Sequence, residues 1–224
     1  MQGRRAGSRA TADRLRHSAG SVYDLPMEVT KYTHACIRIE HDGGILVIDP
    51  GVWSEPRALA GATAVLLTHE HADHVDVLRL RGLGVPVHAP VGAKIDGVRL
   101  EPIQAGDTLE IDGLGVRAVG GRHATIHAGR PDCANLGYIV DERMYHPGDS
   151  LFVPDDPIEI LFSPAHGGWL KLTEAIDFVK AIRPERAIAI HDAQINRRGL
   201  ASAIGWLTDE SGVDYRWVEP GTVI

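Results

Sequence analysis

Cysteine is scarce in this chain: only Cys36 and Cys133 occur among 224 residues. Two cysteines cannot build the disulfide framework of a small secreted protein, and neither stands at a spacing typical of zinc ligands. Single cysteines inside apolar segments more often serve as small buried hydrophobic residues. The low cysteine content therefore favours a reducing compartment, and we expect a cytoplasmic protein.

Long hydrophobic runs and an excess of positive charge are also lacking. No run approaches the roughly 18 to 20 apolar residues of a membrane span. The formal net charge is -7, whereas binding to a phosphate backbone needs clustered Lys and Arg, so we expect no nucleic-acid partner. A small-molecule substrate fits this composition, and a phosphorylated one is not excluded. No pattern in the sequence indicates an oligomeric state.

The composition is sufficient for one sizeable core, because 44% of the residues are hydrophobic. Residues 1–26 differ in character: they hold five arginines among Gly and Ser, and they lack the apolar stretch of a signal peptide. Such a segment offers little surface to bury. We interpret it as a disordered basic leader, with a transit-like arm as the alternative, and residues 27–224 as a single domain.

The densest polar cluster is Thr68-His69-Glu70-His71-Ala72-Asp73-His74, directly after the apolar Ala64-Val65-Leu66-Leu67. In an extended chain, side chains two apart point the same way, so His69 and His71 can converge on one ion. Imidazole beside carboxylate suits zinc, with iron or manganese as alternatives. We interpret the segment as a metal-binding loop at a strand end, dense enough for two cations. A solvated polar turn is the alternative.

Further ligands are expected downstream, because a catalytic zinc usually takes three protein ligands and a water. Three candidates each follow a strand-like apolar run. His123 follows residues 115–119, Asp149 follows residues 136–140, and His191 follows residues 187–190. These ligands would meet if the strand ends lie at one edge of the fold. His127, four residues after His123, stays open as the alternative to it.

The motif resembles the His-x-His-x-Asp-His signature of the metallo-β-lactamase superfamily. Residues 32–37 and 45–51 resemble the opening strands of that family, with Thr33-His34-Ala35 where Gly-His-Ala often stands. Pro164-Ala165-His166-Gly167-Gly168, followed by a helix and a strand, looks most like the branch of L-ascorbate-6-phosphate lactonase. The resemblance implies a four-layer αββα sandwich. Sequence pattern alone indicates only an α/β or α+β fold.

The resemblance also implies a dinuclear site, whose ligands follow from matching the motif positions. The implied ligands are His69, His71 and His123 for one ion, Asp73, His74 and His191 for the other, and Asp149 as the bridge. The cofactors would be two divalent ions, Zn²⁺ first, with Mn²⁺ or Fe²⁺ as alternatives. Two cations about 3.5 to 4 Å apart can hold a bridging hydroxide as the nucleophile.

Catalytic roles are predicted for three side chains. Asp73 is expected both to bind an ion and to orient the water, whereas His34 and His166 are placed near the substrate, with purely structural roles as the alternative. Asp49 is a candidate partner for a ligand histidine, since such histidines usually donate their second N–H to a carboxylate or carbonyl. Trp169 is expected either to wall the pocket or to be buried.

The residues are compatible with two functions. The first is a hydrolase acting on a small lactone, ester or phosphoester. The second is a redox enzyme of the same superfamily with a single iron, similar to persulfide dioxygenase. A metal-stabilised scaffold is disfavoured, because a structural zinc site is usually closed and built from four Cys or His residues.

Helices and strands are predicted from periodicity and end signals. We expect a short helix from Asp73 towards Leu80, a helix capped by Thr173 and stopped by Pro184, and a last helix over residues 200–207. Strands are expected near residues 85–88 and 98–100, among others.

Overall fold

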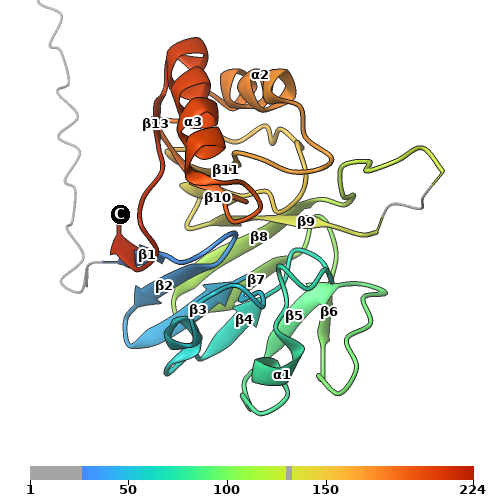
Figure 1. Cartoon of the computed structure of the whole chain (residues 1–224). Coiled ribbons are helices and arrows are strands. Elements are labelled where there is room, and N and C mark those ends of the chain that lie inside the picture. The colour runs from blue at the N-terminus through green and yellow to red at the C-terminus, as the bar shows by residue number, and fades with distance from the viewer. Residues whose placement is uncertain (1–26, 130–132) are drawn as a thin grey trace, which may run out of the picture.

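The structure, a computed structural model, describes residues 27–129 and 133–224. The predicted leader, residues 1–26, lies outside the described residues. Within the described part, the strands form two seven-stranded sheets (Figure 1). Both sheets mix parallel and antiparallel neighbours.

The first sheet is formed mainly by the N-terminal half of the chain and has the strand order β14-β1-β2-β3-β4-β5-β6. Its strands are β1 (Glu28–Lys31), β2 (Ile37–His41), β3 (Gly44–Ile48), β4 (Ala64–Leu66), β5 (Val87–Pro90), β6 (Glu101–Ile103) and β14 (Thr222–Val223). The C-terminal strand β14 therefore closes the edge beside β1.

The second sheet has the order β13-β12-β11-β10-β9-β8-β7. Its strands are β7 (Thr108–Ile111), β8 (Leu114–Gly120), β9 (Leu136–Val140), β10 (Met144–His146), β11 (Ile160–Pro164), β12 (Arg186–Ile190) and β13 (Asp214–Arg216). The helical segments are a 3₁₀ helix η1 (Pro56–Leu59), α1 (Val77–Leu80), α2 (Leu172–Ile182) and α3 (Arg197–Ser211).

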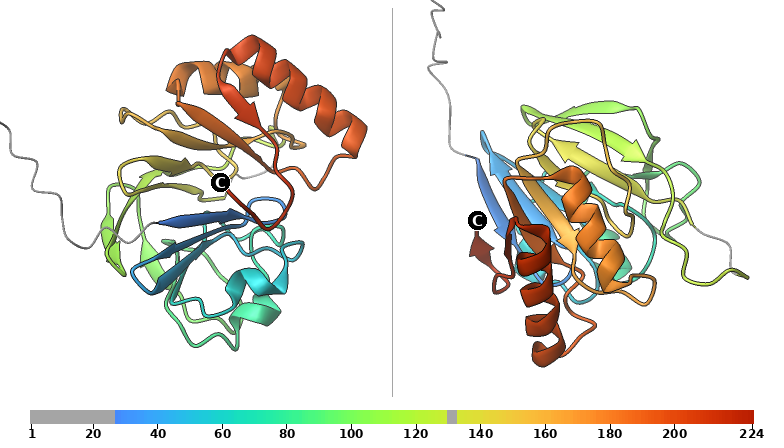
Figure 2. Two further views of the ribbon diagram at one scale, coloured as in Figure 1. Left: turned by 90° about the vertical axis from the view of Figure 1, so that its left-hand side faces the viewer. Right: turned by 90° about the horizontal axis from the view of Figure 1, so that it is seen from above.

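The elements stack as helix, sheet, sheet, helix, which confirms the predicted αββα sandwich. In Figure 2, α2 and α3 cover the outer face of the second sheet, and the short helices η1 and α1 lie on the outer face of the first. Three apolar clusters fill the three interfaces between these layers. One joins the two sheets, through Ile48 and Tyr138 for example; one joins the second sheet to α2; and one joins the first sheet to η1.

Several helices and strands begin or end at other residues than predicted. The α1 helix begins at Val77, because residues 71–75 form turns and the Asp76 carboxylate caps the Arg79 N–H at 3.1 Å. Thr173 is not the cap of α2: Lys171 is, and its backbone N–H donates to Glu174 at 2.9 Å.

The last helix is longer than predicted. The Asn196 side chain caps its start, and Gly212, in the left-handed conformation, ends it. The strand expected at 98–100 lies instead at Glu101–Ile103, because residues 95–98 form a turn.

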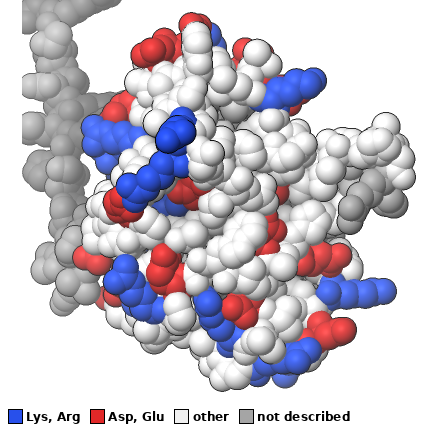
Figure 3. All heavy atoms as spheres, in the orientation of Figure 1, with Lys and Arg blue, Asp and Glu red and all other residues white. Residues whose placement is uncertain are grey.

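The strand topology brings several strand ends to one edge of the sandwich. β3 and β4 are parallel, and β10, β11 and β12 are parallel. The loops that follow these strands therefore emerge on the same side, as predicted from the strand-then-ligand pattern. No helix among the described residues is both long and apolar enough to cross a bilayer. On the face drawn in Figure 3, Lys and Arg side chains are interspersed with Asp and Glu rather than gathered in one basic patch.

Candidate metal centre

Two groups of metal-ligating side chains meet at this edge of the sandwich. The donor atoms within each group lie within 4.8 Å of one another. The first group is His69, His71, His123 and Asp149; the second is His34, Asp73, His74 and His191. The structure thus brings together all seven side chains that the resemblance implied as ligands, and it adds His34.

The first group is assembled from three loops. His69 and His71 follow β4, with Nε2 of His69 3.0 Å from Nδ1 of His71. His123 follows β8 and places its Nε2 3.2 Å from Oδ2 of Asp149. His127, the alternative to His123, is exposed, and its Nδ1 accepts the backbone N–H of Gly129. Of these two histidines, the structure brings only His123 into the group.

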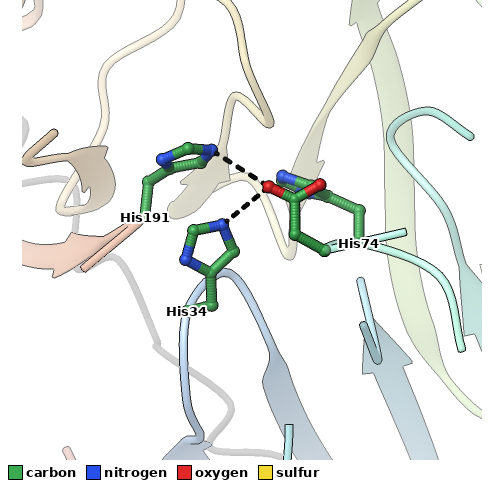
Figure 4. Close-up of side chains that lie close together, drawn as sticks. His34, His74 and His191 are labelled. Carbon is green, nitrogen blue, oxygen red and sulfur yellow. Dashed lines mark hydrogen bonds and ion pairs between the residues drawn. The ribbon is translucent and has the colours of Figure 1, made fainter. Parts of the chain in front are cut away.

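The second group surrounds the Asp73 carboxylate. In Figure 4 the rings of His34 and His191 point at one carboxylate, and His74 lies beside it. The Nε2 atoms of His34 and His191 lie 3.2 Å and 3.7 Å from Oδ2 of Asp73. Asp149 lies between the two groups: its Oδ1 is 3.1 Å from Nε2 of His74, and its Oδ2 is 3.1 Å from Nε2 of His191.

Outer contacts fix the orientation of the rings. Nδ1 of His74 donates to Asp49 at 2.7 Å, and Asp49 in turn accepts both the N–H and the hydroxyl of Thr68. Nδ1 of His123 donates to the Ala124 carbonyl at 2.6 Å. Because the Nδ1 atoms are engaged in this way, the Nε2 atoms of both rings face the centre. Asp49 thus makes the contact expected of it.

Two glycines allow the loops to approach this closely. A Cβ on Gly51 would lie 1.8 Å from the carbonyl oxygen of Asp73, so the motif loop packs directly on the backbone after β3. Gly148, with φ of +62°, leaves no room for a side chain beside Thr68. Gly51 therefore positions the motif loop, and Gly148 positions the turn that carries Asp149.

The site opens to solvent through a cleft of about 320 Å³. Its lining consists of His71, Asp73, His123, Ile126, Asp149, Gly168, Trp169, His191 and Gln194. Trp169 is half-buried, so it is a wall of the cleft rather than a core residue, and its Nε1–H donates to Oδ2 of Asp149 at 2.9 Å. His166 is not part of this lining; it is half-buried, and its Nδ1 has no hydrogen-bond partner among the described residues.

Burial and mutual charge shift the pKa values of these groups. Burial lowers the pKa of the His34 imidazole to about 4. Burial also opposes the charged form of His74, yet the carboxylates of Asp149 and Asp49 outweigh it and raise the pKa of His74 well above its usual value. Burial would raise the pKa of Asp73, but the hydrogen bond from His34 and the neighbouring His74 lower it to about 2. Asp73 is therefore ionised at neutral pH, ready to bind a cation.

The donor set fits divalent cations. Nε2 of His74, Nε2 of His123 and Oδ1 of Asp149 are buried at the centre, and they have no hydrogen-bond partner of adequate geometry among the described residues. A buried polar atom without a partner costs free energy, and such atoms in both donor groups fit the donors of bound cations. Imidazole with carboxylate is the donor chemistry that zinc, iron and manganese accept.

Several residues around the site were not predicted from the sequence. Gln194 lines the cleft and donates from its side-chain amide to Oδ2 of Asp73 at 3.2 Å. Lys31 and Asp192 form a buried ion pair behind His34. A lysine at the end of a predicted opening strand and an acid next to His191 were the available signals. Cys133 is not the buried residue expected: it is half-buried, with Sγ 3.9 Å from Nε2 of His71.

The chain is similar to known proteins in sequence and in fold. The family described as "Beta-lactamase superfamily domain" matches residues 28–191. Protein Rv0786c of Mycobacterium tuberculosis is 36% identical over 202 residues, which cover 85% of this chain and 95% of that protein. A UPF0173 metal-dependent hydrolase of Chelativorans sp. is 31% identical over 166 residues, 63% of this chain and 71% of that protein.

Among solved structures, Igni18, a metallo hydrolase from Ignicoccus hospitalis, superposes with a TM-score of 0.70 at 19% identity. The match covers 88% of this chain and 97% of that one. At this identity, the likeness shows that the two proteins share a fold.

Proposed function

The chain belongs to the metallo-β-lactamase superfamily and is a metal-dependent hydrolase, and from that premise we propose that it holds two divalent cations and hydrolyses a small lactone, ester or phosphoester. Zn²⁺ is the first choice of metal, with Mn²⁺ or Fe²⁺ as alternatives. The branch of L-ascorbate-6-phosphate lactonase stays a prediction.

The observation that carries the proposal is the pair of adjacent donor groups with Asp149 between them. His69, His71 and His123 would hold one cation, and Asp73, His74 and His191 would hold the other. Asp149 contacts members of both groups, as a bridging carboxylate must. A single-ion site would leave one of the two buried groups without a ligand.

The chemistry divides between the cations and the side chains. Bound divalent cations would lower the pKa of a water towards roughly 7 and polarise the scissile bond of the substrate. Asp73, half-buried at the cleft, would orient that water. Trp169 and Ile126 would line the path of the substrate. His166 would donate a proton to the leaving group from the edge of the site.

The test combines metal analysis with a hydrolysis screen. Protein stripped with a chelator and reloaded with Zn²⁺ should bind close to two ions per chain and cleave at least one member of a panel of lactones, thioesters, phosphodiesters and phosphomonoesters. Asp73→Ala and His191→Ala should each lose one ion and most activity. Asp209→Ala, an exposed acid on α3, is the matched control. A fully active Asp73→Ala enzyme with unchanged metal content would refute the dinuclear site.

The alternative, an iron redox enzyme similar to persulfide dioxygenase, needs one iron. The second donor group favours the hydrolase. Protein purified without added metal would separate the two functions, because the redox enzyme would carry one iron per chain and consume oxygen with a persulfide substrate.

A further inference from the structure

His34 stands among the possible ligands of the second group, but its hydrogen bonds assign it a different role. The backbone N–H of Ala193 donates to Nδ1 of His34 at 3.4 Å. A nitrogen that accepts a hydrogen bond carries no proton, so the ring proton of His34 is on Nε2. That atom lies 3.2 Å from Oδ2 of Asp73. An Nε2 that carries a proton has no lone pair for a metal, and it donates to the carboxylate instead.

We propose that His34 is a positioning residue: its Nε2–H, with the side-chain amide of Gln194, holds Oδ2 of Asp73 and leaves Oδ1 free to bind a cation. This rests on the metal site proposed above. The side-chain amide of Gln194 reaches the same oxygen at 3.2 Å, so two donors meet at Oδ2 (Figure 4 shows the contact of His34). The Asp73 carboxylate is thereby held in one orientation before any ion arrives.

The backbone of His34 is held firmly enough to serve this role. The residue is fully buried and has φ of +68°, a conformation that non-glycine residues rarely adopt. Its N–H donates to Oδ1 of Asp192 at 3.0 Å, and its carbonyl accepts the N–H of His191 at 3.2 Å. The ring also packs edge-on against Trp53, with centroids 4.9 Å apart. These contacts hold the His34 imidazole so that its Nε2 faces Asp73.

Asp192 is the centre of this arrangement. Besides the N–H of His34, it accepts hydrogen bonds from the Lys31 ammonium, which lies 3.1 Å from both carboxylate oxygens. It also accepts the indole N–H of Trp217 at 2.5 Å. It therefore joins the loop after β1 to the loop after β12. His34 and His191 approach Asp73 from these two loops.

The experiment measures metal binding rather than turnover. Metal-free protein is titrated with Co²⁺ against a chromophoric chelator, and the visible spectrum reports the ligands of each ion. His34→Phe should lower the affinity for one of the two ions about 10- to 100-fold, the usual effect of losing a hydrogen-bond partner of a ligand. Both ions should still bind at saturating metal, with an unchanged spectrum. His34→Gln, which keeps a side-chain N–H, should recover part of the affinity.

Two further variants complete the design. Gln194→Met removes the second donor at an exposed position, so it should weaken the same ion without disturbing the fold, even if His34→Phe folds poorly. His41→Phe, the same change at the far end of β2, should leave both affinities unchanged.

The proposal is overturned if His34→Phe and Gln194→Met both leave the affinities unchanged. It is also overturned if His34→Phe abolishes one ion at saturating metal and alters the spectrum, since His34 would then be a ligand. A wild-type protein that binds no divalent ion refutes this inference together with the metal site. A protein that binds two ions and shows these effects but hydrolyses no substrate refutes the hydrolase function alone.

Discussion

Breaking the buried ion pair between Lys31 and Asp192 should destabilise the protein far more than replacing both partners. The Lys31 side chain has no exposed surface, and that of Asp192 is 6% exposed. Burial lowers the pKa of the Lys31 ammonium even though the Asp192 carboxylate opposes this shift. The pair is therefore costly to bury, and each charge depends on the other.

The expected loss of stability depends on the partners that remain after each substitution. Lys31→Met leaves Asp192 with the N–H groups of His34 and Trp217 but no cation. Removing one partner of a buried pair typically costs about 3 to 5 kcal/mol. For a chain of this size, that corresponds to a Tm lower by roughly 6 to 20 °C. Asp192→Asn should cost a similar amount, because it leaves the ammonium unpaired.

The double variant Lys31→Met/Asp192→Asn carries no charge at positions 31 and 192, and only one of the two N–H donors to residue 192 then faces an amide NH₂. Its free energy of unfolding should fall by only about 1 to 3 kcal/mol, the cost of one buried donor without an acceptor. Urea unfolding of the metal-free proteins, followed by circular dichroism, measures all three values. If the loss in the double variant equals the sum of the two single losses, the pair is not coupled and the reasoning fails.

Three other perturbations test the site. Gly51→Ala should displace the motif loop, lower metal affinity in a chelator titration and lower the free energy of unfolding by about 1 to 3 kcal/mol, as overpacking does. Gly82→Ala, where a Cβ meets nothing within 4 Å, is the control, and equal metal affinity and stability of the two variants would contradict the close approach at Gly51. Chelation with EDTA should lower the Tm, because ions present at 100 times their Kd stabilise the native state by about 2.7 kcal/mol; an unchanged Tm would mean that no ion is bound. His166→Ala should reduce kcat about 10²- to 10⁴-fold while both ions stay bound; loss of an ion would make His166 a ligand, and full activity would leave it a structural residue.

The ligand-rich segments could be predicted because their signal is local. The motif at residues 68–74 concentrates its donors within seven residues, and each later candidate directly follows an apolar run. Alternation and strand ends therefore indicate which side chains can meet at one edge. The layered fold followed from the resemblance rather than from the periodicity, which is compatible with several α/β arrangements.

The contacts that orient those ligands could not be predicted in the same way. The hydrogen bond from His34 to Asp192 joins residues 158 positions apart, and that from Gln194 to Asp73 joins residues 121 apart. Such pairs depend on how the two sheets come together, and one sequence carries no local pattern for them. The start of α2 was mispredicted for a more local reason. Thr173 is a good capping residue, but the Glu174 side chain accepts the N–H of Lys171, and the helix is capped two residues earlier than predicted.

The central claim, that two cations held by these two groups carry out the hydrolysis, is tested most directly by titrating metal-free protein with Zn²⁺ while the cleavage of the best substrate from the screen is followed. The account predicts that about two ions bind per chain and that activity rises until the second ion is bound. Full activity in the presence of excess chelator, or with a single ion per chain, would contradict it.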